Sequence, residues 1–161
     1  MDWSAHMNKS LCLAKEALEV GEVPVGCIFV DDDGNILASG RNTVNETKNA
    51  TRHAELNCVD TIVKAGLVEK LSNITVVVTV EPCIMCASVL ANIGFCTNII
   101  YGCANDRFGG CGTVLAVPGL KNCKVKGGLF GDQAMDLLKQ FYKGQNPNAP
   151  ENKVKKKPVN L

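Results

Sequence analysis

The sequence predicts an α/β fold, a three-layer α/β/α sandwich around a mixed five-stranded sheet, and three observations point to it. Helical and strand patterns alternate along the 161 residues, which favours a sheet covered by helices. Residues 74–80 are β-branched almost throughout, as in a strand that is buried on both faces. Apolar runs on both sides of the turn 31–35 predict an antiparallel hairpin.

The remaining elements follow in chain order. Apolar residues at three- and four-residue spacing predict a first helix that starts at Trp3 and ends near Gly21. Strands are expected at 23–30, 36–41, 74–80, 98–102 and 123–126, and further helices at 53–64, from Pro82 onward and at 133–143. Polar residues at 42–51 predict an exposed loop. The glycine-rich segment 103–122 is typical of a functional loop. We expect one domain over 1–145 and a tail over 146–161.

Composition indicates a soluble globular protein, and we expect it in the cytoplasm, the nucleus or both. Apolar residues make up 46% of the chain and charged residues 20%. No stretch is long and apolar enough to span a bilayer, and the N-terminus does not resemble a signal peptide, so we expect no membrane association. The nine cysteines are an odd number without a secretion signal, which argues for reduced thiols instead of a disulfide framework.

Positive charge is concentrated at the end of the chain. Residues 151–161 hold Lys153, Lys155, Lys156 and Lys157 against Glu151, for a net charge of +3. Since the whole chain carries +1, the remainder carries +1 minus +3, or −2. A basic tail on a mildly acidic body suggests an anionic partner such as RNA. The alternative interpretation is a solvated, disordered terminus.

The first motif with chemical meaning is Pro82-Cys83-Ile84-Met85-Cys86. Its two cysteines are three residues apart at the start of a predicted helix and therefore share a face. The helix N-terminus favours the thiolate form, and two thiolates can bind one zinc ion. By itself the motif is ambiguous, because redox-active proteins use the same Cys-x-x-Cys spacing.

The second motif, His53-Ala54-Glu55, supplies a third ligand in His53. Three protein ligands leave the fourth tetrahedral position to water, which is typical of a catalytic zinc site. Glu55 follows His53 by two positions, about 200° around a helix, so both can reach one site only beyond the helix end. We therefore expect the zinc between the N-termini of two helices, one beginning near His53 and one near Pro82.

Each of these residues has an ordinary explanation when taken alone, as a loop histidine, a surface acid or a core thiol. Together and in this order they match the signature of zinc-dependent deaminases. In that chemistry Glu55 takes a proton from water, and hydroxide attacks the amine-bearing carbon of a purine or pyrimidine. The same carboxyl group then protonates the ring nitrogen and the leaving amine, which gives a carbonyl group and ammonia.

Nearly the whole sequence resembles the catalytic subunits of the eukaryotic heterodimeric tRNA adenosine deaminases, in the cytidine-deaminase-like superfamily. The residues that carry the resemblance are 17–19, 22–27, 40–42, 47–55, 81–87, 101–103, 107–112, 141–143, 146–150 and 153–157. The resemblance implies conversion of adenosine to inosine at the wobble position of tRNA. It also implies a homologous partner subunit that lacks the catalytic glutamate.

The resemblance further implies roles for individual residues. Asn42 would hydrogen-bond the flipped base or its ribose, and the backbone of Ala54 and of Pro82 would contact the base or the attacking water. Residues 22–25, including Val25, would line the pocket. The four lysines of the tail would bind the tRNA backbone.

Two rival functions remain open from the residues. A deaminase of free bases or nucleotides, acting on cytosine, guanine or deoxycytidylate, would carry the same zinc motifs. The loop 107–112 and the basic tail argue against it. A structural or RNA-binding zinc subunit without catalysis is the second rival. Glu55 argues against that function, because a structural site has no use for a proton shuttle.

Overall fold

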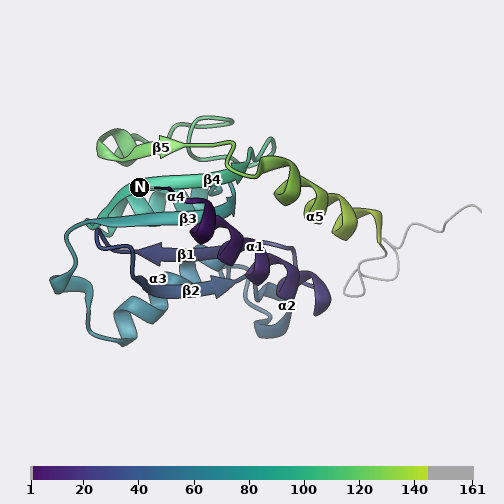
Figure 1. Ribbon diagram of the computed structural model, residues 1–161, viewed down its shortest axis with the longest axis horizontal. Helices are drawn as coiled ribbons and strands as arrows, with labels where there is room; N and C mark the ends of the chain where they lie inside the picture. The colour runs from purple at the N-terminus through teal and green to yellow at the C-terminus, as the bar shows by residue number, and fades with distance from the viewer. Residues whose placement is uncertain (1, 145–161) are drawn as a thin grey trace, which may run out of the picture.

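The central sheet contains five strands, β1 (Gly26–Val30), β2 (Ile36–Arg41), β3 (Ile74–Val80), β4 (Cys96–Cys103) and β5 (Lys124–Lys126). In the computed structural model, which describes residues 2–144, they lie in the order β2-β1-β3-β4-β5 (Figure 1). β1 is antiparallel to β2 and β3, whereas β3, β4 and β5 are mutually parallel. The prediction of a mixed five-stranded sheet is therefore confirmed.

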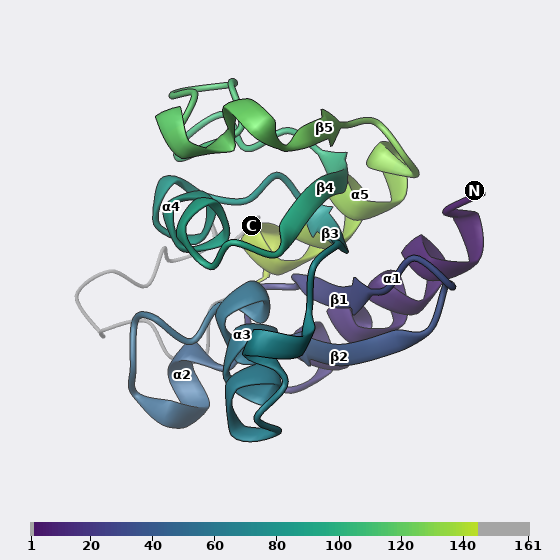
Figure 2. The same ribbon diagram turned by 90° about the vertical axis from the view of Figure 1, so that its left-hand side faces the viewer.

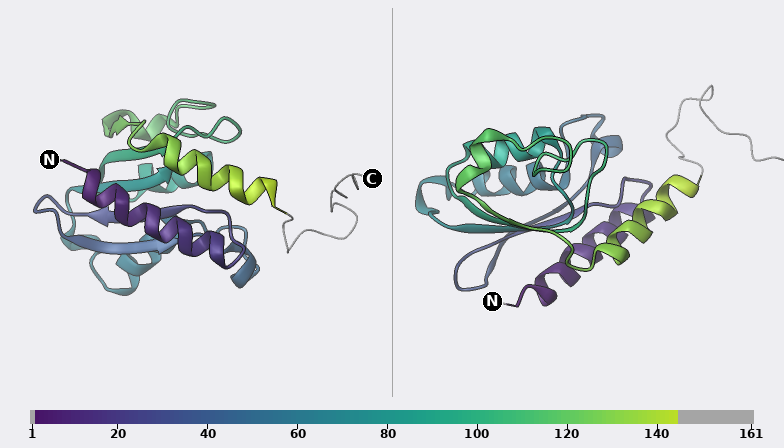
Figure 3. Two further views of the ribbon diagram at one scale, coloured as in Figure 1. Left: turned by 45° about the vertical axis from the view of Figure 1, so that its right-hand side comes forward. Right: turned by 90° about the horizontal axis from the view of Figure 1, so that it is seen from above.

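Helices cover both faces of this sheet. α1 (Ser4–Glu19) and α5 (Gly131–Lys143) lie on one face, and α3 (Ala54–Lys64) and α4 (Ile84–Asn92) lie on the other (Figures 2 and 3). Each face has its own apolar core, with Met7, Val77 and Leu137 on the first and Phe29, Val76 and Leu90 on the second. The three-layer α/β/α prediction is confirmed.

The packing of α1 on β1 requires a glycine at position 26. A Cβ atom added there would lie 2.0 Å from the carbonyl oxygen of Ser10 and 2.8 Å from the backbone nitrogen of Ala14. The Ser10 hydroxyl in turn donates to the carbonyl oxygen of Val77 at 3.0 Å. The helix backbone therefore rests directly on the sheet, which fixes the start of β1 beside the residues that enter the pocket.

Several predicted boundaries were wrong. β1 begins at Gly26 and not at residue 23, because the N–H of Val25 bonds to the carbonyl of Val23 and turns the chain away from the sheet. Pro82 does not begin α4. Cys83 is the N-cap with extended backbone, and the carbonyl oxygen of Pro82 accepts the N–H of Gly110. Because of this contact with the loop at Gly110, α4 begins at Ile84, two residues after Pro82.

The predicted exposed loop 42–51 contains a short helix, α2 (Val44–Thr47). Its first N–H groups bond to a distant carboxylate, that of Glu22, which sequence patterning does not reveal.

Two 3₁₀ turns complete the fold, η1 (Val68–Lys70) and η2 (Pro118–Asn122). The predicted tail 146–161 lies outside the described residues. Within the described part of the chain, no helix combines the length and the apolar character needed to cross a bilayer.

Candidate active site

The structure brings the three predicted metal ligands together at the ends of two helices. His53 is the N-cap of α3 and Cys83 the N-cap of α4, while Cys86 lies in the first turn of α4. The Nδ1 atom of His53 is 3.5 Å from Sγ of Cys83 and 3.5 Å from Sγ of Cys86. All three donor atoms lie within 4.8 Å of one another.

This donor set fits a zinc ion. Bonds of about 2.3 Å to sulfur and about 2.0 Å to nitrogen, at tetrahedral angles, would separate the nitrogen from each sulfur by about 3.5 Å. That separation agrees with the observed spacing around His53. Thiolate and imidazole ligands also suit zinc better than magnesium or calcium, which prefer oxygen donors. The site therefore has the chemistry and the size of a three-ligand zinc centre.

Hydrogen bonding links the protonation of the three donors. Hydrogen bonds with Cys86 and with the His53 ring together lower the pKa of Cys83 to about 4, against the effect of burial. The shared hydrogen bond and burial raise the pKa of Cys86, and Cys83 raises the pKa of His53. Binding of a metal to both sulfurs and to Nδ1 must therefore displace protons.

Glu55 lies beside this cluster, in the first turn of α3, and is only 3% exposed. Burial raises the pKa of its carboxyl group to about 7, and the Cys83 sulfur also raises it, whereas a hydrogen bond with its own backbone N–H opposes the shift. A carboxyl group with a pKa near neutrality can both take and return a proton at physiological pH.

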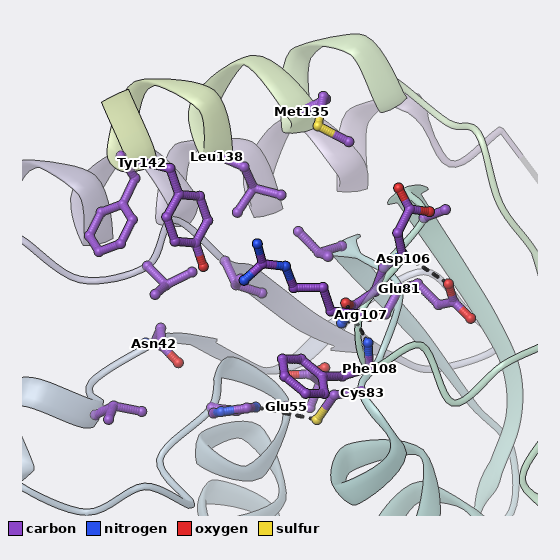
Figure 4. Close-up of a pocket in the computed structure, with 18 of the residues that line it drawn as sticks. Asn42, Glu55, Glu81, Cys83, Asp106, Arg107, Phe108, Met135, Leu138 and Tyr142 are labelled. Carbon is purple, nitrogen blue, oxygen red and sulfur yellow. Dashed lines mark hydrogen bonds between the residues drawn. The ribbon is translucent and has the colours of Figure 1, made fainter. Parts of the chain in front are cut away.

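A cavity of about 830 Å³ opens over the cluster. Glu55 and Cys83 lie at its bottom, Asn42 lies on one wall, and Tyr142, Leu138 and Met135 project from α5 along the opposite wall (Figure 4). The segment 104–108, part of the predicted functional loop, supplies the remaining side. The contribution of α5 was missed from the sequence, although the 69% exposure of Tyr142 marks an aromatic side chain outside the core.

The loop from Asn105 to Thr113 is held by a buried carboxylate that sequence reasoning also missed. Glu81 is 1% exposed, and its oxygens accept the backbone N–H groups of Asn105, Cys111 and Thr113 at 3.0 to 3.2 Å. Gly109 packs against it so closely that an added Cβ would lie 2.6 Å from Oε2. Glu81 immediately precedes Pro82 and Cys83, so one segment carries a metal ligand and organises the pocket loop.

The remaining predicted substrate contacts fall into two groups. Asn42 and Val25 line the cavity, as does Val23, whereas Glu22 is fully buried behind them. Ala54 and Pro82 are buried next to the ligands, and their predicted contacts through the backbone stay predictions. The four tail lysines, Lys153, Lys155, Lys156 and Lys157, lie outside the described residues.

Comparison with known proteins places this site in a family. Residues 2–103 match the model of the cytidine and deoxycytidylate deaminase zinc-binding region. The chain is 48% identical to tRNA-specific adenosine deaminase 2 of Xenopus tropicalis, over 94% of this chain and 95% of that protein. It is 36% identical to tRNA-specific adenosine deaminase subunit tad2 of Schizosaccharomyces pombe, over 91% of this chain and 39% of that protein.

Solved structures of other deaminases share the fold of this chain. A structure from work on A-to-I editing by tRNA:A34 deaminases has a TM-score of 0.74 and 27% identity, covering 83% of this chain and 99% of that one. A guanine deaminase from Nitrosomonas europaea has a TM-score of 0.74 at 20% identity, covering 88% and 85%, and shares the fold. With the motifs at the helix ends and the family match across most of its length, the chain belongs to the zinc-binding cytidine and deoxycytidylate deaminase family.

Proposed function

We propose that this protein catalyses the hydrolytic deamination of adenosine to inosine at the wobble position of tRNA, as the catalytic subunit of a heterodimer. The observation that carries the proposal is the convergence of His53, Cys83 and Cys86 beside buried Glu55 at the bottom of an open cavity. The names of the relatives, which are tRNA-specific adenosine deaminases, support the choice of substrate.

The chain's own residues account for the proton transfers. Zinc bound by the three donors would supply hydroxide near neutral pH, because it lowers the pKa of a bound water. Glu55, whose buried carboxyl group has a raised pKa, would take a proton from the attacking water and deliver it to N1 of the adenine ring. The second proton would come from the hydroxyl group that has added to the amine-bearing carbon. It would pass through the same carboxyl group to the leaving amine, which gives the carbonyl group of inosine and ammonia. The backbone of Ala54 and of Pro82 would hold the base or the water during these steps.

The walls of the cavity support a polynucleotide substrate. Phe108 is 62% exposed and Tyr142 is 69% exposed, and both line the cavity together with the cations Arg107 and Lys139. Exposed aromatic side chains can stack on splayed bases, and cations can bind phosphates. A free-base deaminase has less use for such groups at the mouth of its pocket.

The domain over 1–145 would hold the reaction, and the tail over 146–161 would add RNA affinity. We further infer a cytoplasmic or nuclear location, or both, because tRNA is present in each compartment. The homologous partner, which would lack the catalytic glutamate, is inferred from the family resemblance. Glu55 supports the proposal that this chain is the active half of such a pair.

Incubation with a tRNA that carries adenosine at the first anticodon position tests the function. Inosine, detected by sequencing, is expected when the chain is co-expressed with its homologous subunit, and much less is expected from the chain alone. Full activity of the chain alone would favour a homodimer. Deamination of cytosine, guanine or deoxycytidylate with no inosine in tRNA would favour a nucleobase or nucleotide deaminase.

Truncation after Pro150 is expected to weaken tRNA binding without loss of zinc. The truncation removes four lysines, so the slope of log K against log salt concentration should become shallower by up to about 3. Binding measured over a salt series checks this. Replacing the four lysines with glutamine in the full chain is the control that separates charge from length. Equal affinity and slope for the truncated and complete chains would rule out a role of the tail in binding.

A further inference from the structure

Glu22 is a buried carboxylate that the deamination chemistry does not use. It is fully buried, and within the described part of the chain it forms no salt bridge. Its Oε1 atom accepts the backbone N–H groups of Asn45 at 2.7 Å and Glu46 at 2.8 Å. Its Oε2 atom accepts the side-chain amides of Asn42 at 3.2 Å and Asn45 at 3.3 Å. Four donors therefore converge on one side chain.

This arrangement determines which end of the Asn42 amide faces Glu22. Carboxylate oxygens only accept hydrogen bonds, so the amide nitrogen of Asn42 must point to Glu22 and the oxygen must point elsewhere. Among residues 2–144, no donor bonds to that oxygen. Asn42 is 4% exposed and lines the cavity together with His53 and Glu55 (Figure 4). The oxygen is therefore a positioned acceptor without a protein partner.

The chemistry of a nucleotide within RNA restricts what this acceptor can bind. The 3′ and 5′ oxygens are esterified, and the unprotonated ring nitrogens of adenine are acceptors. Only the 6-amino group and the 2′-hydroxyl can donate, and the amino group must lie at the reacting centre. We propose that Glu22 is a positioning residue, which orients Asn42 so that its oxygen accepts the 2′-hydroxyl of the target adenosine. This inference rests on the proposed function and makes Asn42 a reader of RNA against DNA.

The wild-type complex tests the proposal without any mutation. Two anticodon stem-loop RNAs are compared, identical except that the target nucleotide is adenosine in one and 2′-deoxyadenosine in the other. The deoxy target should react with a kcat/KM lower by about tenfold to a hundredfold, because the bound nucleotide would cover the Asn42 oxygen and leave it unpaired. Equal kcat/KM values for the two RNAs would overturn this inference but would leave the proposed function standing. Absence of inosine from both RNAs would overturn the proposed function and the inference with it.

Glu22→Gln tests the positioning role. The glutamine oxygen can still accept the N–H groups of α2, but its NH₂ group opposes the amide nitrogen of Asn42, which is expected to rotate. In Glu22→Gln, the kcat/KM of the adenosine RNA divided by that of the 2′-deoxyadenosine RNA should fall toward one, while the zinc content is unchanged. Asn42→Ala should give the same ratio. Glu46→Gln, an exposed change on the same helix, should keep the wild-type ratio. A folded Glu22→Gln variant that keeps the wild-type ratio would overturn the proposal.

Discussion

Glu55→Gln is expected to lower kcat for deamination by about 10²–10⁴-fold, the usual contribution of a general acid–base group. Glutamine keeps the size and the buried position of the side chain but cannot carry a proton between water, ring and amine. Zinc should remain bound, because the donor atoms that fit a metal are Nδ1 of His53 and the sulfurs of Cys83 and Cys86. Single-turnover rates on tRNA and zinc content by mass spectrometry check both parts.

The melting temperature of this variant supplies a further check. Removing a buried ionisable carboxyl group should leave the melting temperature unchanged or raise it, since burial of a charge is unfavourable. Glu46→Gln, in which an exposed glutamate is changed, is the matched control and should keep full activity. Loss of zinc from the Glu55 variant would show that Glu55 acts as a ligand. Retained activity would mean that another group moves the protons.

The zinc-site geometry could be anticipated from the sequence because its parts are local. Cys83 and Cys86 are one helical turn apart, and the offset between His53 and Glu55 requires a site beyond a helix end. Both constraints follow from helix geometry alone. The structure places His53 and Cys83 as N-caps of two helices that meet, which is where such a site can form. The layered fold could also be predicted from the sequence, because the alternating helical and strand periodicities determine which elements form.

Two of the features that could not be anticipated depend on buried carboxylates that act over long sequence distances. Glu22 caps a helix that begins at Val44, and Glu81 binds backbone groups as far away as Thr113. The motif His53-Ala54-Glu55 marks Glu55 in the sequence, but no local pattern reveals the roles of Glu22 and Glu81. Their roles depend on the distant segments that surround each one in the fold. Backbone N–H groups of distant segments bond to Glu22 and Glu81, whereas Glu55 lies at the bottom of the cavity beside the metal ligands.

Cys86→Ala is expected to abolish zinc binding and to reduce deamination at least as far as Glu55→Gln does. The change removes one of three donors and leaves His53 and Cys83, too few to hold a catalytic zinc ion. Loss of the metal should also lower stability, because a ligand present at a hundred times its Kd contributes about 2.7 kcal/mol to folding. Zinc content and thermal unfolding, with and without added zinc, measure these effects.

Cys103→Ala is the matched control, because that thiol is also buried but belongs to the core on the opposite face of the sheet. It should keep its zinc and its activity and lose only some packing. If Cys86→Ala lost stability but kept zinc, the sulfur of Cys86 would be a core group and the metal would need another donor. If both variants lost zinc, the cysteines would act through the fold and not as ligands. The metal is assigned to the meeting point of α3 and α4 only if Cys86→Ala loses its zinc while Cys103→Ala keeps it.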